Sequence, residues 1–302
     1  GRTDAGTSRS QRQRAILESY VGLLAGIGGT SLEAQAGLNA AGEAFRIADA
    51  ARHHGVQVAL SASAARTAVR DPDLADLVRR EQDAKHQSDA LLVGLADMLS
   101  RPTGERSADD ISALRRNIEQ LQGARESLLR EIAGRFPDYA ELTKPKPATI
   151  EQARADLLPG EALISTYVSG DKTYVWALGK EGKVAFAAVD LGEKALAETV
   201  SRLRISLEPN VATLGDIPAF DVAAAHGLYA KLLKPVEAGW KAASSLLVVA
   251  DGALGQLPLS LLPTEPVQLG PETTPLFANH RDVPWLARTH AVTILPSVAS
   301  LK

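Results

Sequence analysis

Residues 244–263 read SSLLVVADGALGQLPLSLLP, and this stretch decides the predicted fold class. Five apolar residues, 246–250, run without interruption into Asp251 and Gly252. A continuous apolar run of this length is typical of a strand that is buried on both faces of a parallel sheet. Because strand and helix patterns alternate around it, we predict an α/β layered sheet.

Asp251 is the first candidate functional residue, because α/β folds place functional groups at the carboxyl ends of their strands. Asp–Gly is also a common turn pair, since the aspartate bonds its own backbone and the glycine accepts a positive φ. No base or nucleophile lies near Asp251 in the sequence. We therefore expect Asp251 and Gly252 to turn the chain, and Asp251→Ala to lower stability more than activity.

The rest of the second half continues the strand and helix alternation. Apolar residues with a period of two predict a β-meander of three strands, over 162–168, 173–179 and 184–191. Helical periodicity predicts two helices that follow it, over 193–207 and 220–233. A last strand is predicted within RTHAVTILPS, residues 288–297.

The first half, up to about residue 136, carries almost no strand signal and is rich in strong helix formers. A short helix is predicted over 15–25, and an apolar stripe at helical spacing then runs from Leu38 to Ala51. Asp71 and Pro72 end that segment and begin a helix that runs to residue 99. The pattern Ser-x-x-Asp at Ser107 starts another helix, and we expect these two long helices to form an antiparallel hairpin.

A proline-rich junction, FPDYAELTKPKPATIEQA at residues 136–153, separates the two halves, and Thr149 is placed to cap a short helix within it. We predict an all-α helical region over 1–140 and an α/β region over 141–302. No clean 34-residue period is visible in the helical region.

The composition and charge of the chain limit which partners, cofactors and compartments are expected. A formal net charge of -3 gives no reason to expect nucleic acid or an anionic membrane as a partner. No window approaches the length of an apolar membrane span, and no basic and apolar leader is visible, so we predict a soluble, cytoplasmic protein. The sequence has no cysteine, and its six histidines lack metal-ligand spacing, so we predict no metal and no cofactor.

The other candidate residues do not form a complete catalytic or binding site. His290 alternates with apolar residues on a predicted strand, and a lone strand histidine is more often structural than catalytic. Ser260 and Ser297 lack the Gly-x-Ser-x-Gly elbow that exposes a nucleophile. The glycines at 26–29 follow a helix and lack a Lys-Ser or Lys-Thr, so they do not form a phosphate loop. We therefore predict no catalytic, cofactor-binding or metal residue within this chain.

The order of these features resembles the CHAT family, the caspase-like domains associated with tetratricopeptide repeats. After a helical region come four segments in the family's order. They are FPDYAELTKPKPATIEQARADLLPGEALISTYVSGDKTYVWAL, LYAKLLKPVE, LLVVADGALGQLPLSLL and WLARTHAVTILPSVASL. The resemblance covers residues from about 136 to 302, and it implies the amino-terminal part of a caspase-like layered sheet. In this family the preceding helical region carries tetratricopeptide repeats, so the resemblance implies at most one degenerate repeat of this kind within residues 1–140.

The resemblance also implies where chemistry would lie. Active members of the family use a histidine–cysteine dyad, in which the imidazole deprotonates the thiol that attacks a peptide carbonyl. Both motifs follow the segment that here reads LPSVASL, and His290 does not match the catalytic position. We therefore expect the dyad beyond Lys302 or in a separate chain. A truncated chain, a processed fragment and a degenerate relative all remain open.

Two hypotheses follow. In the first, the chain is the regulatory and scaffold part of a cysteine-peptidase-like protein, with a protein substrate and, as a partner, a carboxy-terminal catalytic fragment. In the second, it is a non-enzymatic module that binds a protein partner through the helical hairpin.

Overall fold

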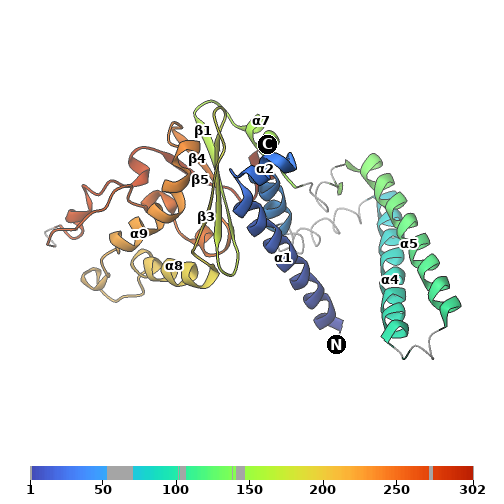
Figure 1. Ribbon diagram of the computed structural model, residues 1–302. Helices are drawn as coiled ribbons and strands as arrows, with labels where there is room; N and C mark the ends of the chain where they lie inside the picture. The colour runs from blue at the N-terminus through green and yellow to red at the C-terminus, as the bar shows by residue number, and fades with distance from the viewer. Residues whose placement is uncertain are drawn as a thin grey trace. The chain divides into compact units, whose positions relative to one another are not determined.

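The computed structural model describes residues 2–52, 71–100, 102, 107–137, 139–140, 147–271 and 275–301 (Figure 1). The chain divides into two compact units. The first, which we call the sheet unit, consists of Gly1–Arg52 and Pro147–Lys302, and the second, the helical unit, consists of His53–Lys146. The helical unit is therefore inserted into the sequence of the sheet unit.

A mixed five-stranded sheet lies at the centre of the sheet unit. Its strands are β1 (Glu161–Val168), β2 (Thr173–Gly179), β3 (Ala185–Val189), β4 (Ser245–Val249) and β5 (Ala291–Ile294). Their order is β3-β2-β1-β4-β5, with β1, β2 and β3 paired antiparallel and β1, β4 and β5 paired parallel. The predicted α/β class, the meander and the buried parallel strand are confirmed.

One face of the sheet is covered by α8 (Glu193–Leu207) and α9 (Val222–Leu228), which Figure 1 places together on one side of the strands. Side chains from alternate positions of β1 and β4, such as Ile164 and Leu246, are buried against these helices. The predicted second helix ends early, because α9 passes into a π-helical turn at Tyr229–Leu233 and a 3-10 turn at Lys234–Gly239. Pro235 in that segment has no amide hydrogen with which to continue an α-helix.

The other face is covered by α1 (Arg2–Ile27), a helix over residues 40–52 and α7 (Ile150–Asp156). Phe45 meets Trp176 of β2 edge to face at 5.8 Å between ring centroids, and the indole of Trp176 donates to the carbonyl of Ala41 at 2.9 Å. Trp176 also stacks on Phe186 of β3 at 4.8 Å. The amino-terminal helices thus share a core with the sheet.

The predicted amino-terminal helices have different bounds in the structure. α1 begins at Arg2 rather than near residue 15. The predicted stripe lies on the helix over 40–52 except for its first residue, Leu38, and α2 (Ser31–Ala36) ends just before it at Gly37, whose φ is 62°. The side chain of Asn39 then accepts from the amide of Gly42 at 3.0 Å and starts a new helix, which leaves Leu38 outside it. The later part of that predicted segment, from residue 53, lies outside the described residues.

The helical unit contains α4 (Pro72–Ser100) and α5 (Ala108–Arg135). Both predicted starts are confirmed, since Asp71 accepts from the amides of Asp73 and Leu74 and Ser107 accepts from the amide of Asp110. The two helices share a small apolar core that includes four buried side chains, Leu74, Leu77, Leu128 and Ile132. Arg135 also pairs with Asp73 at 2.7 Å, which joins the last turn of α5 to the first turn of α4.

None of the helices in the described part of the chain is long and apolar enough to cross a membrane.

Candidate functional site

Polar side chains gather at the carboxyl ends of the parallel strands β1 and β4, where α/β folds place their sites. We call this group the strand-end cluster. It consists of Arg14, Glu18, Asp49, Arg52, Ser165, Thr166, Tyr167 and Asp251. Helices from the amino-terminal segment supply four of its members, and the strands and the turn after β4 supply the rest.

Arg52 is the central cation of the strand-end cluster, and its side chain is only 10% exposed. One terminal nitrogen, Nη2, donates to the hydroxyl of Ser165 at 3.0 Å and to the carbonyl of Thr166 at 2.8 Å. Burial lowers the pKa of Arg52, while the charges of Asp49 and Asp251 oppose that shift. An arginine at such a site keeps its charge, because the pKa of a guanidinium starts far above neutral pH.

Asp49 is the most deeply buried acid of the cluster, with 1% of its side chain exposed. Its Oδ1 lies 3.5 Å from Nη1 of Arg52, one helical turn further along. Its Oδ2 accepts a hydrogen bond from the backbone amide of Ala148 at 2.8 Å. The carboxylate therefore compensates a buried cation and a buried backbone donor together.

Asp251 closes the cluster on the β4 side. Gly252 has a φ of 58°, so the predicted turn is present. The predicted bond to the turn's own backbone is wrong, because the carboxylate reaches across to β1 and accepts from the amide of Val168 at 2.8 Å. The amide of Asp251 in turn donates to the hydroxyl of Thr166 at 2.9 Å. The parallel pairing of β1 with β4 brings both strand ends together, which local turn chemistry alone does not reveal.

We expect Asp251→Ala to lower the free energy of unfolding by about 2 kcal/mol, because the buried amide of Val168 loses its acceptor. Urea unfolding of the variant, followed by tryptophan fluorescence, measures this loss. Asp251→Asn is the matched control, since its amide oxygen can still accept from Val168, and it should lose clearly less. Equal losses in the two variants would show that charge, rather than this hydrogen bond, sets the role of Asp251.

An outer layer of the cluster contains Tyr167, Glu18 and Arg14. The phenol of Tyr167 donates to Oε1 of Glu18 at 3.1 Å, and Nε of Arg14 donates to the same oxygen at 2.8 Å. Burial and the neighbouring carboxylate raise the pKa of Tyr167 well above its usual value, so the phenol stays protonated at neutral pH. Tyr167 can therefore donate a hydrogen bond here, but it cannot serve as a base.

The cluster does not assemble a nucleophile and a base from the described residues. Ser165 and Thr166 are buried, and their hydroxyls accept from Arg52 and from the amide of Asp251. His290 lies at the opposite, amino-terminal end of β5, where its Nδ1 lies 2.8 Å from the hydroxyl of Thr289 and its ring meets Trp240. Because β4 and β5 run parallel, His290 and Asp251 lie at opposite ends of these strands.

Within the described residues, neither candidate serine has a hydrogen bond to a histidine or a carboxylate. Ser260 is part of a 3-10 turn at Leu259–Leu261, and Ser297 shares a hydrogen bond of 3.0 Å with the hydroxyl of Ser300. Within the described residues, no group of three or more His, Cys, Asp or Glu is arranged to hold a metal ion.

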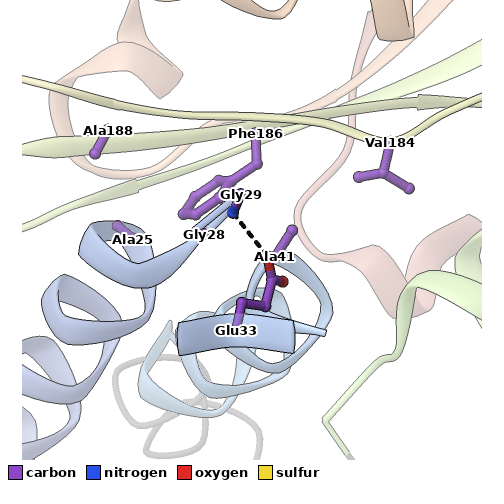
Figure 2. A pocket seen from close by; sticks show the side chains of 8 residues that line it. All are labelled: Ala25, Gly28, Gly29, Glu33, Ala41, Val184, Phe186 and Ala188. Carbon is purple, nitrogen blue, oxygen red and sulfur yellow. Dashed lines mark hydrogen bonds between the residues drawn. The ribbon is translucent and has the colours of Figure 1, made fainter. Parts of the chain in front are cut away.

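A small cavity of about 320 Å³ lies beside the glycines that end α1 (Figure 2). It is lined by Ala25 of α1, Glu33 of α2, Ala41 of the helix over residues 40–52 and Phe186 and Ala188 of β3, together with Gly28, Gly29 and Val184 outside these elements. Glu33 is its one ionisable side chain, and its two oxygens accept from the amides of Gly29 and Ala40, both at 2.7 Å. Since this carboxylate already has partners and the other lining groups are apolar or backbone, the cavity has no convergent set of polar groups for a ligand.

These two backbone hydrogen bonds lower the pKa of Glu33 below its ordinary value. A lowered pKa in the folded state means that the ionised group adds stability above the ordinary pKa of a glutamate, about 4.3, and that this stability is lost as the pH falls further. We therefore expect Glu33→Gln to have a lower melting temperature than the wild type at pH 7. The difference should shrink as the pH falls below about 4, and a constant difference from pH 7 to pH 3 would contradict this role.

No family model, curated protein or solved structure matches the chain. The fold and the cluster therefore define only a class, an α/β protein with an open mixed sheet and a buried ionic cluster at its parallel strand ends.

Sequence reasoning missed Asp49 and Arg52, although they are central to the cluster. Their signal is an acid and a base three residues apart on a helix. Glu43 and Arg46 show the same spacing in the same helix, yet that pair is much more exposed. Spacing alone does not separate a buried ion pair from a surface one, because burial depends on which helix face meets the sheet.

Proposed function

We propose that this chain is the scaffold and regulatory part of a caspase-like cysteine peptidase of the CHAT type. In this proposal the histidine–cysteine dyad is supplied by residues outside these 302, in the same polypeptide or in a separate one. The order of the four sequence segments supports it, as does a sheet in which β1, β4 and β5 run parallel. The substrate would be a protein, because such a dyad attacks peptide carbonyls.

The observation that carries the proposal is the open edge of β5. The amide of Ala291 donates to Ser244, just before β4, and the amide of Leu295 donates to Val248 of β4. The amides of Val292 and Ile294 between them therefore point to the other side. No described strand pairs with that side, and Ile294 is 44% exposed. An apolar strand edge of this kind is a template for pairing, and proteins normally cover or charge it. Further strands that carry the dyad would extend the sheet here.

The full natural gene product provides the test, with a thiol-reactive peptide probe as the readout. Because these 302 residues contain no cysteine, any probe attached through a thiol must lie on the other residues of the active assembly. We expect one strongly labelled cysteine there, and we expect its replacement by alanine to abolish peptide cleavage. The absence of a probe-reactive cysteine and of peptidase activity would overturn the proposal.

A pair of variants connects that test to the β5 edge. Ile294→Lys places a charge on the edge, whereas Ile205→Lys places the same charge on α8 at a position that is 57% exposed. We expect Ile294→Lys to abolish probe labelling and Ile205→Lys to retain it. Equal labelling in both would show that the β5 edge does not receive the catalytic part.

A second candidate function is a non-enzymatic module that binds a protein partner through the α4–α5 pair, as an antiparallel hairpin. The observation that favours it is the exposed apolar surface towards the end of α4, where Val93 is 71% exposed and Leu99 39% exposed. These side chains lie outside the apolar core that the two helices share. If deletion of residues 73–136 leaves every partner bound in a pull-down from its own cells, this candidate fails.

A further inference from the structure

The chain passes between the two units at two places, after Arg52 and before Pro147. Both places lie within hydrogen-bonding reach of one buried side chain. Asp49 sits three residues before the first crossing, and its Oδ2 accepts from the amide of Ala148, one residue after the second. These two positions are 99 residues apart in the sequence, so a single carboxylate holds together the ends of the whole insertion.

The same carboxylate is connected to the carboxyl ends of β1 and β4. Its Oδ1 faces Nη1 of Arg52, and Nη2 of Arg52 donates to the carbonyl of Thr166. The hydroxyl of Thr166 accepts from the amide of Asp251, whose carboxylate accepts from Val168. An unbroken series of polar contacts therefore runs from the second crossing to the strand ends.

We propose that Asp49 and Arg52 form a clamp that couples the inserted helical unit to the carboxyl ends of β1 and β4. Asp49 fixes both crossings, and Arg52 passes their position to Thr166 and Asp251. A perturbation that travels along the chain from the helical unit enters the sheet unit beside Arg52 or Pro147, next to this clamp. The inference does not rest on a peptidase activity.

Burial makes this contact more than a loose tether. Asp49 and Arg52 are 1% and 10% exposed, so separating them within the core would leave a buried charge without its counter-charge, which is strongly unfavourable. The clamp therefore favours the arrangement in which Asp49 faces Arg52 and Ala148 together. The buried Nε of Arg52, which has no described partner, leaves one donor available for a rearranged contact.

Hydrogen exchange of the full chain tests the coupling at both ends. Asp49→Ala should accelerate exchange about tenfold in residues 147–152, beside the lost bond, and also in residues 165–169, at the other end of the series. Coupling between two sites is reciprocal, so Asp251→Ala should accelerate exchange in residues 147–152 as well. Glu43→Gln, in the same helix and in an exposed pair with Arg46, should change neither segment.

The result that overturns the proposal is a local one, in which each variant changes only the segment beside its own lost bond. Asp49→Ala could also unfold the sheet unit, which exchange in α8 would report as a rise of the same size. In that case Asp49→Asn decides, because it keeps an oxygen for Ala148 but removes the charge that faces Arg52. Accelerated exchange in residues 165–169 of Asp49→Asn supports the clamp, and unchanged exchange there rejects it.

Discussion

Arg52→Ala should lower the free energy of unfolding of the sheet unit by about 3–5 kcal/mol, the loss typical of a buried ion pair from which one partner is removed. The truncated side chain leaves Asp49, which is 1% exposed, without the cation that compensates its charge. The carbonyl of Thr166 and the hydroxyl of Ser165 lose their donor at the same time. Each of these groups is buried, so water cannot replace the guanidinium without opening the core.

Tryptophan fluorescence during urea unfolding measures this loss in the sheet unit alone. All three tryptophans, Trp176, Trp240 and Trp285, belong to that unit, so unfolding of the helical unit leaves the signal unchanged. The matched control is Arg46→Ala, in the same helix and also paired with an acid three residues away. Arg46 is 42% exposed, and pairs of that kind contribute about 1 kcal/mol or less. Similar losses in the two variants would contradict the buried role of Arg52.

Gly239→Ala should destabilise the sheet unit by about 3 kcal/mol, because it forces two backbone segments apart. Gly239 ends the 3-10 turn that leads towards β4, and a Cβ atom built on it would lie 2.2 Å from the carbonyl oxygen of Ala177 in β2. The obstacle is backbone rather than the tip of a flexible side chain. Either the turn or β2 must therefore move, and the buried side chains between them lose contact.

Gly227→Ala provides the control for Gly239→Ala. Gly227 lies inside α9, and a Cβ atom built there meets nothing within 4 Å. Alanine has the higher helix propensity, so this change should raise stability by about 0.5–1 kcal/mol. The two glycines are 12 positions apart and carry the same substitution, yet the expected effects have opposite signs. If Gly239→Ala were as stable as the wild type in the urea titration, the turn could not pack on β2 as closely as the structure shows.

Local patterns in the sequence predicted many individual elements. The helix over 193–207 is found with those bounds, and the period of two correctly placed the three strands of the meander. Thr149 caps α7 as predicted, through a reciprocal pair of bonds with Gln152. Such signals are reliable here because each depends on residues within one turn of a helix or one hairpin of the sheet.

The same local patterns did not predict most of the strand-end cluster. Asp251 was singled out for its place after a buried strand, but its partner, the amide of Val168, lies 83 residues away in the sequence. Asp49 and Arg52 were not singled out, because the apolar stripe indicates the buried side of the helix over 40–52 but not which polar groups of β1 and of the segment at Ala148 lie against it. The exclusion of Leu38 from the helix over 40–52 was also not predicted, since its spacing of three residues to Ala41 fits a continuous helix.

The sequence by itself determined the alternation of apolar residues, and therefore which segments become strands and helices and which strand is buried on both faces. Only the tertiary structure decided that residues 40–52 pack on the sheet, with Phe45 against Trp176, and that the helical unit is an insertion between Arg52 and Pro147. The physical reason is that burial of a charge depends on contacts between segments far apart in the chain. The contribution of the Asp49–Arg52 salt bridge to stability depends on the low-dielectric surroundings that those contacts create.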